Sequence, residues 1–377
     1  MLTIDAVHLR EINMPLAHPF ETSFGRTTMR RILLVEIESD GLTAWGECVA
    51  GEHPYFSEES IDTAWHVTEF ELAPRLLGKE LVGGGGGVPA LFHQVRGNRM
   101  AKAALENAVW DLDAQRKRVS LASLLGGTRR TIACGVSIGI QSSPEALMDI
   151  IAKELAAGYQ RIKLKCKPGW DTTIFEQVGA RWPDIRLSCD ANSAYRVADI
   201  EHIVAWDEFD LMMIEQPLWY DDFYFHSMLQ KRLDTPICLD ESIRNRRDAL
   251  AAIDMESCRV INIKVGRVGG FSEAIAVHNA AAERGVPVWC GGMLETGIGR
   301  AHNIALSSLP NFALPGDVSA SARYWAEDII EPEVVVSPQG EIAVPDGVGS
   351  GYTVRRDRIE KLTVRRQSIR AAAHVMV

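Results

Sequence analysis

The chain has 377 residues, of which 46% are hydrophobic and 24% are charged, a composition typical of a folded globular protein and not of a disordered one. A chain of this length favours about two domains. The formal net charge of −10 and the scattered lysine and arginine residues argue against a nucleic-acid-binding surface. No long apolar stretch predicts a transmembrane helix, and no secretion signal is visible at the N-terminus. We therefore expect neither a nucleic-acid partner nor a membrane.

The seven cysteines include no Cys-x-x-Cys motif, and several lie in apolar, strand-like segments. Cysteines in such segments behave as small buried hydrophobic side chains rather than as metal ligands. The sequence therefore predicts reduced cysteines and a cytoplasmic location.

The first 60 residues predict an antiparallel meander of strands at 3–14, 31–39 and 43–50, with a turn at Asp40-Gly41. The pattern then becomes helical, and residues 101–112 form a strong amphipathic helix that Gly126-Gly127 follows. Five glycines at 83–87 lack the preceding strand and the following lysine of a phosphate-binding loop. We expect them to form a flexible surface loop.

From residue 132 onward, short apolar runs alternate with amphipathic helices, as in the consecutive βα units of a parallel barrel. Helices at 144–157 and 270–284 each end at a glycine, Gly158 and Gly285. The last 55 or so residues return to turn-rich, strand-like sequence and are expected to pack against the N-terminal region. Eight barrel strands are predicted, at 132–138, 162–166, 187–189, 211–214, 237–239, 260–263, 286–290 and 313–318.

Charged residues stand at the ends of five successive barrel strands. Asp190, Glu215 and Asp240 are 25 residues apart, Lys165 comes 25 residues before Asp190, and Lys264 comes 24 residues after Asp240. Residues at the carboxyl ends of barrel strands share one mouth, where barrel enzymes carry out their chemistry. Because side chains alternate along a strand, Lys163 and Lys165 are both expected to enter the barrel interior, where Asn192 and Asn262 are also available.

For any one of these residues, solvation of the barrel rim or a structural salt bridge is the simpler explanation. Applied to all of them, it fails to explain why three carboxylates stand on adjacent strands, where they repel one another unless a cation lies between them. Ligands that are all oxygen suit a hard ion. The pattern therefore predicts a Mg²⁺ site at Asp190, Glu215 and Asp240, with Mn²⁺ as the alternative.

The lysines predict the chemistry at that site. Lys165 and Lys264 lie on opposite sides of the predicted barrel, with the metal-binding strands between them. We expect the like charge of Lys163 and the nearby dication to lower the pKa of Lys165 toward the range of a general base. The implied reaction is removal of a proton α to a carboxylate, with the metal stabilising the enediolate.

At these residues the chain resembles the enolase superfamily, and its paired lysines resemble the muconate lactonizing enzyme subgroup. More local motifs are similar to the o-succinylbenzoate synthase / N-acylamino acid racemase family; they lie at 19–25, 45–50, 263–270, 292–299 and 315–321. The resemblance implies an α/β fold: a modified (β/α)7β TIM barrel, at residues 126–320, under an α+β capping domain. The cap would comprise residues 1–125, to which the C-terminal segment 321–377 returns.

The resemblance also implies the site. Asp190, Glu215 and Asp240 would bind Mg²⁺, Lys165 and Lys264 would face a carboxylate substrate, and Lys163 would tune Lys165. Ser137, Asn192, Gly292, Leu294 and Arg267 would line the substrate pocket. The family reaction is the syn dehydration of 2-succinyl-6-hydroxy-2,4-cyclohexadiene-1-carboxylate to 2-succinylbenzoate in menaquinone biosynthesis. The family also implies a homo-oligomer, either a dimer or an octamer.

Other functions remain open at this point. N-succinylamino acid racemisation by two lysines is the first alternative, and Arg267 favours the branch in which both activities coexist. A dipeptide epimerase would need an Asp-x-Asp clamp that residues 316–319 lack. A Schiff-base aldolase would use Lys264 but leave the carboxylates without a role, and a non-catalytic binding barrel would need neither. The cap loop at Gly51-Glu52-His53 departs from the larger apolar residue common in relatives, and His53 is not expected to be a metal ligand.

Overall fold

The computed structural model describes residues 2–371. Met1, from the predicted cap segment 1–125, and residues 372–377, from the predicted segment 321–377, lie outside the described residues. The N-terminal part forms an antiparallel sheet of β1 (Ala6–Thr22), β2 (Gly25–Ser39) and β3 (Leu42–Cys48). The predicted meander is confirmed, although β1 and β2 extend further toward the hairpin that joins them. The strand β15 (Thr363–Arg370) pairs with β1, which gives the order β15-β1-β2-β3. The predicted return of the C-terminal segment to the N-terminal sheet is therefore observed.

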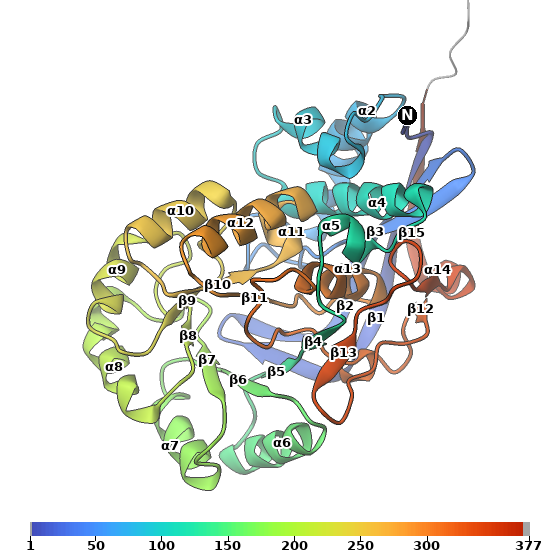
Figure 1. Ribbon diagram of the computed structural model, residues 1–377. Coiled ribbons are helices and arrows are strands. Elements are labelled where there is room, and N and C mark those ends of the chain that lie inside the picture. Colours follow the sequence, from blue (N-terminus) through green and yellow to red (C-terminus); the bar gives the residue numbers. More distant parts are fainter. Residues whose placement is uncertain (1, 372–377) are drawn as a thin grey trace, which may run out of the picture.

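Helices pack on this sheet and complete the cap (Figure 1). The longest helix, α4 (Arg99–Lys117), contains the predicted helix at 101–112. One set of residues from the sheet and these helices forms a hydrophobic core of the cap, and another set of sheet residues, including Ile12, Ile32 and Trp45, belongs to the core of the barrel. The remaining cap elements are α1 (Ile61–Val67), the π-helical turn Thr68–Leu72, α2 (Ala73–Leu76), α3 (Val88–Phe92) and α5 (Leu121–Leu125).

The five-glycine segment forms a regular turn and not the irregular surface loop that was predicted, although Gly83 and Gly86 are exposed. Gly84–Gly87 forms a 3-10 turn in which Gly84 and Gly85 are buried against α4. A Cβ on Gly85 would lie 2.4 Å from the Trp110 ring, and one on Gly84 would lie 2.0 Å from Asp113. Glycine is therefore required here because the turn lies directly on a helix, a contact that the local sequence does not reveal.

The barrel contains seven parallel strands in the order β11-β10-β9-β8-β7-β6-β5, surrounded by helices (Figure 1). The strands are β5 (Gly135–Ile138), β6 (Arg161–Lys165), β7 (Leu187–Asp190), β8 (Ile214–Glu215), β9 (Ile237–Leu239), β10 (Val260–Ile263) and β11 (Val288–Cys290). The helices are α6 (Pro144–Ala156), α7 (Thr172–Arg181), α8 (Ile200–Val204), α9 (Tyr224–Gln230), α10 (Arg246–Asp254), α11 (Val265–Val268), α12 (Phe271–Glu283) and α13 (Gly297–Ser307). Short 3-10 turns occur at Val197–Asp199, Ala205–Phe209 and Ser321–Arg323.

The two ends of the barrel sequence differ from prediction. The segment 132–138 is divided into β4 (Thr131–Ala133), which pairs with β13 (Glu341–Ala343), and β5. The predicted eighth strand at 313–318 is not a regular strand. It nevertheless bonds to both sheet edges, because Asp317 N donates to Cys290 O at 2.8 Å and Gly135 N donates to Gly316 O at 2.6 Å. These bonds bring the two edge strands, β5 and β11, together through an irregular segment.

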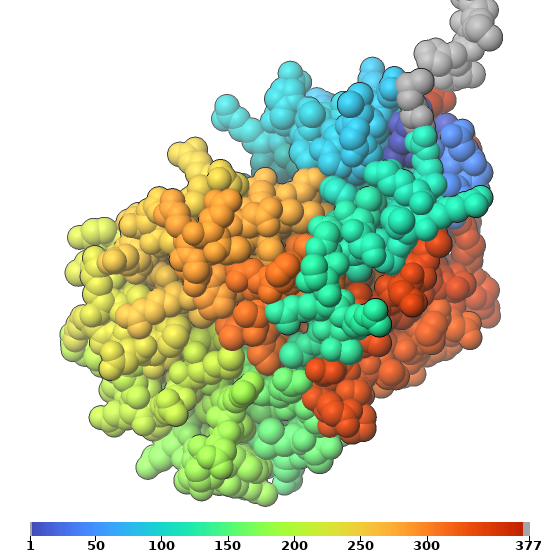
Figure 2. Space-filling view, viewed as in Figure 1, coloured from blue at the N-terminus to red at the C-terminus, as the bar shows by residue number. Residues whose placement is uncertain are grey.

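The C-terminal segment runs beside the N-terminal part on the face shown in Figure 2. It contains β12 (Ile330–Glu331), β14 (Thr353–Val354) and α14 (Arg356–Leu362) in addition to β13 and β15. Among residues 2–371, no helix is both long and apolar enough to cross a membrane.

Two buried carboxylates of the cap bind the N-terminal ends of barrel helices. Glu47 of β3 accepts hydrogen bonds from Thr296 Oγ1 at 2.6 Å and Gly299 N at 2.9 Å, at the start of α13. Glu106 of α4 accepts one from Ser272 N at 3.0 Å, in the first turn of α12. Such ends carry unpaired N–H groups and partial positive charge, so these two contacts fix the cap on the barrel.

Replacing Gly270 by alanine tests the contact at α12. Gly270 has φ of +122°, and a Cβ there would lie 1.5 Å from Glu106 Oε2. We expect Gly270→Ala to lower the free energy of unfolding by at least about 2 kcal/mol, because the carboxylate must move and the backbone is strained. Chemical denaturation measures this loss. The control is Gly179→Ala in α7, where an added Cβ meets nothing within 4 Å; equal stability of the two variants would contradict the expectation.

Glu106 also predicts a pH dependence of stability. Burial raises its pKa to about 7, from an ordinary value of 4.5. The folded protein therefore holds this proton more tightly than the unfolded chain, so the contribution to stability is present below pH 4.5 and is lost as the pH rises through 7. As the pH rises from 4.5 to above 7, the unfolding free energy of the wild type should fall by up to about 3 kcal/mol more than that of Glu106→Gln. Denaturation of both proteins at several pH values measures the difference, and parallel curves would show that Glu106 does not titrate there.

Candidate active site

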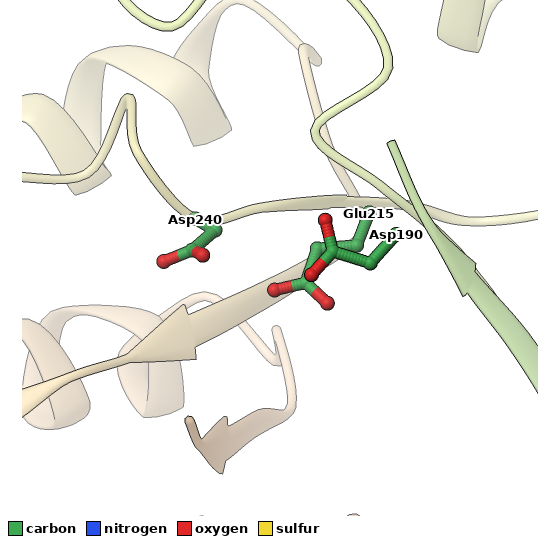
Figure 3. Close-up of side chains that lie close together, drawn as sticks. All are labelled: Asp190, Glu215 and Asp240. Atoms are coloured by element: carbon green, nitrogen blue, oxygen red, sulfur yellow. The ribbon is translucent and has the colours of Figure 1, made fainter. Parts of the chain in front are cut away.

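Three carboxylates lie close together at the carboxyl ends of neighbouring strands (Figure 3). Asp190 is the last residue of β7, Glu215 is the last residue of β8, and Asp240 directly follows β9. One oxygen from each lies within 4.8 Å of the others, and all three residues are fully buried. The strand register places Asp190 opposite Glu215. The structure thus brings together the three residues that the sequence spacing singled out.

The two lysines of β6 both point into the barrel, as the alternation along the strand predicts. Lys163 Nζ lies 2.8 Å from Glu215 Oε2, and Lys165 Nζ lies 2.5 Å from Asp190 Oδ2. Lys264, directly after β10, donates to Asp240 Oδ2 at 2.7 Å. In the sheet order, β7, β8 and β9 separate β6 from β10. Lys165 and Lys264 therefore flank the carboxylates from two sides.

Carboxylates raise the pKa of two lysines in the cluster. Burial acts to lower the pKa of Lys264, but attraction to Asp240 and Glu241 outweighs it, so the pKa is raised. The pKa of Lys163 is also raised, because the attraction of Asp317 and Glu215 outweighs its burial. At both Lys163 and Lys264 the attraction of neighbouring carboxylates is thus larger than the effect of burial.

The carboxylates themselves are strongly perturbed. Burial, together with the charge of Asp190, raises the pKa of Glu215 to about 7. Burial opposes ionisation of Asp190 too, but attraction to Lys165 and Lys163 lowers its pKa. One carboxyl group of the pair is thus easily protonated while the other stays ionised, the pattern expected when two like charges share a small buried space.

The donor set fits a hard divalent cation. The three groups are carboxylates, buried, and close enough to share one ion. Oxygen-only ligation is preferred by Mg²⁺ and Mn²⁺, and three protein ligands leave positions for water or substrate. A cation at this position would compete with Lys165 and Lys264 for the same oxygens of Asp190 and Asp240. Its binding would therefore free both ammonium groups for other partners.

A cavity of about 390 Å³ lies between the lysines that pair with this cluster and the cap, and the three carboxylates themselves do not line it. Its lining includes Lys163, Lys165 and Lys264 together with four of the five predicted pocket residues, namely Ser137, Asn192, Gly292 and Leu294. Asn192 accepts a hydrogen bond from Lys165 Nζ at 2.7 Å. The cap supplies the opposite wall from β2 and from the loop at 51–56, and the ring of Phe56 lies 4.2 Å from Lys264 Nζ. The cavity is therefore shared by the barrel and the cap.

Arg267, the fifth predicted pocket residue, lies outside this lining. It is buried behind the site, where its guanidinium donates to Asp240, to Asn262 O at 2.5 Å and to Ile243 O at 2.7 Å. The structure therefore places Arg267 against a carboxylate of the cluster and the turn after β9, and not against the cavity.

Two further residues complete the cluster. Asp317, in the irregular segment that joins the sheet edges, lies 2.6 Å from Lys163 Nζ and also pairs with Arg161. Asn262 donates to Glu215 Oε1 at 2.7 Å. Sequence reasoning placed Asn262 near the site but gave Asp317 no role, because Asp317 falls outside the 25-residue spacing. Its position at the end of the last predicted barrel strand was the available signal.

Family models match almost the whole chain. Residues 4–126 match the N-terminal domain of the mandelate racemase / muconate lactonizing enzyme family, and residues 147–358 match the enolase C-terminal domain-like family. With a barrel and cap of this kind around a buried acidic cluster, the chain belongs to the enolase superfamily. It is an enzyme of that superfamily.

Comparison with individual proteins shows which members of the superfamily the chain is similar to. The chain is 53% identical over 363 residues to an o-succinylbenzoate synthase of Geobacillus kaustophilus, covering 96% of both chains. It is 43% identical to an N-succinylamino acid racemase of Thermus thermophilus, covering 96% of this chain and 98% of the relative. A crystal structure of an enolase superfamily member from Listeria innocua superposes with a TM-score of 0.94 at 39% identity, covering 98% of this chain and 100% of that one. Family membership counts against both the aldolase and the non-catalytic barrel.

Proposed function

We propose that this enzyme is an o-succinylbenzoate synthase, which dehydrates 2-succinyl-6-hydroxy-2,4-cyclohexadiene-1-carboxylate to 2-succinylbenzoate. One observation carries the proposal. Lys165 and Lys264 lie on two sides of the three-carboxylate cluster, and both lysines line the same cavity. Relatives named for this activity, 40–53% identical over nearly the full length, support the same reaction.

In the proposed mechanism Lys165 is the general base. Its Nζ, held by Asn192 and Asp190, removes the proton α to the ring carboxylate of the substrate. The same ammonium group then gives its proton to the departing hydroxyl on the same face, so that water leaves and the ring becomes aromatic. Lys264 stays protonated on the other side and stabilises the anion formed between the two steps. Lys163 holds Glu215 in place.

The proposed cofactor is Mg²⁺, with Mn²⁺ as the alternative, held by Asp190, Glu215 and Asp240. When bound, it supplies positive charge that polarises the substrate carboxylate and makes the α-proton more acidic. Around it, Asn262 and Arg267 fix the orientation of Glu215 and Asp240.

Racemisation of N-succinylamino acids is a second candidate activity of the same cavity. It needs one base on each face of the α-carbon, and Lys165 and Lys264 reach the cavity from β6 and from the end of β10. Both reactions begin with removal of a proton α to a carboxylate, so one arrangement of residues serves both. Relatives at 43–44% identity named for the racemase support this activity as secondary.

A side-by-side assay tests the proposal. Purified enzyme with Mg²⁺ is given either the cyclohexadiene substrate or an N-succinylamino acid, and kcat/KM is measured for each. We expect a larger kcat/KM for dehydration. A protein that racemises the N-succinylamino acid but forms no 2-succinylbenzoate would overturn the assignment and leave the racemase.

The proposal extends to the setting of the enzyme. A synthase of this kind would act in menaquinone biosynthesis, and we propose a cytoplasmic location because all seven cysteines are buried and free. We propose a homo-oligomer, a dimer or an octamer, which light scattering would distinguish. For the domains we propose a cap at 1–125, a barrel at 126–320 and a returning segment at 321–377. The hydrophobic cluster formed by residues of the cap alone supports a separate cap domain.

A further inference from the structure

The cap wall of the cavity contains a buried arginine with no counter-ion. Arg30 of β2 is only 7% exposed and lines the cavity. Its guanidinium makes two long hydrogen bonds, to Val49 O and Ala50 O, both at 3.4 Å. Among residues 2–371, nothing accepts a hydrogen bond from its Nε, and no carboxylate forms a salt bridge with it. A buried charge in this state is costly unless an anion pairs with it.

The acidic residues near Arg30 are engaged elsewhere. Glu47 accepts hydrogen bonds at the start of α13, and Glu295 accepts from Met293 N and Asn303 Nδ2, each at 2.9 Å. Their charges favour the cation from a distance, but burial is the larger effect and lowers the pKa of Arg30. Arg30 Nε is therefore buried without an acceptor, and the residue lines the cavity without forming a salt bridge to any carboxylate among residues 2–371.

A second arginine of the same strand lies nearer the opening. Arg26 is exposed and lines the same cavity, and its side chain forms no hydrogen bond or salt bridge with any residue that the structure describes. The lining also contains two acidic residues, Glu52 and Asp317. Asp317 is paired with Lys163 and Arg161, so only the exposed Glu52 opposes the charge of Arg26 at this wall.

The cavity is thus cationic at both ends. The barrel end holds Lys165 and Lys264 beside the acidic cluster, and the cap wall holds Arg30 and Arg26. A ligand with one carboxylate bound at the cluster would direct a second carboxylate, a few bonds away, toward the cap. Both 2-succinylbenzoate and the N-succinylamino acids are dianions of this shape.

We propose that Arg30, assisted by Arg26 at the opening, binds the distal carboxylate of the succinyl group and so selects dianionic over monoanionic substrates. This inference rests on the proposed function and deepens it, because it assigns the end of the substrate that does not react. Arg30 and Arg26 would act in binding, with no part in proton transfer.

The test compares two ligands that differ only in the distal group. 2-Succinylbenzoate and 2-butanoylbenzoate, in which a methyl group replaces the distal carboxylate, are titrated calorimetrically into the Mg²⁺-loaded enzyme. We expect the wild type to prefer 2-succinylbenzoate by roughly 10-fold or more in Kd, the range of a charge-assisted hydrogen bond. Arg30→Gln should abolish the preference, and Arg26→Gln should reduce it by about 3-fold, since an exposed charge is screened. Arg96→Gln, an exposed arginine outside the cavity lining, should leave it unchanged.

Arg30→Lys is a second variant that separates loss of binding from a folding defect, because it keeps the buried positive charge but loses the planar guanidinium. It should retain only part of the preference for 2-succinylbenzoate. If Arg30→Lys and Arg26→Gln both keep the wild-type preference, the inference is wrong. That outcome differs from failure of the proposed function, in which the wild type would bind neither ligand and dehydrate no substrate. In all variants kcat for dehydration should change less than KM.

Discussion

Lys165→Ala should lower the rate of dehydration by at least about 10³-fold, because it removes the group proposed to take and return the proton. The Kd for 2-succinylbenzoate should change only a few-fold, since other residues hold the carboxylates. Stopped-flow or steady-state assay of the cyclohexadiene substrate measures the rate, and calorimetry measures the Kd. The control is Lys153→Ala, an exposed lysine of α6.

A lower rate of dehydration in Lys165→Ala could come from loss of the base or from weaker metal binding, and the two explanations must be separated. Lys165 lies 2.5 Å from Asp190, so its removal also changes the charge beside the acidic cluster. Titration of the variant with Mg²⁺ decides between the two. Unchanged Mg²⁺ affinity with lost turnover supports the role as a base, whereas full turnover in the variant would show that another group removes the proton.

Glu215→Gln should lower Mg²⁺ affinity by at least about 100-fold and dehydration by at least about 10³-fold, since a neutral amide replaces a carboxylate in a three-carboxylate site. The variant has nearly the same shape, and its amide oxygen still accepts a hydrogen bond from Lys163 or Asn262. Metal binding by calorimetry, alongside a thermal melt, checks that the effect is local. Glu208→Gln, at an exposed position, is the matched control. Unchanged Mg²⁺ affinity in Glu215→Gln would remove Glu215 from the metal site.

The sequence predicted the centre of the site well because two regular periods coincide there. The 25-residue spacing places Asp190, Glu215 and Asp240 on neighbouring strands, and the alternation along β6 directs Lys163 and Lys165 inward. Both are properties of the local backbone, so no knowledge of tertiary packing is needed. Lys264 follows from the same argument one strand further along.

The errors occur where distant packing decides the structure. Hydrogen bonds to two sheet edges, and not strand periodicity, position Asp317. The glycines at 84–87, for which local composition predicted a loop, form a turn packed against Trp110. Arg267 turns behind Asp240 because the carboxylate and two carbonyl groups lie on that side of the helix. The sequence offers no reason to select Arg30 as a binding residue, because its burial without a salt-bridge partner depends on how the cap packs on the barrel.

The most direct test of the account is the Mg²⁺ dependence of dehydration by the wild-type enzyme. The protein is stripped of metal with EDTA, dialysed, and assayed for 2-succinylbenzoate formation before and after addition of Mg²⁺. We predict no detectable product from the stripped enzyme and full recovery of activity with Mg²⁺. Full activity in the stripped enzyme, with metal content verified as zero, would contradict the assignment of Asp190, Glu215 and Asp240 as an essential metal site.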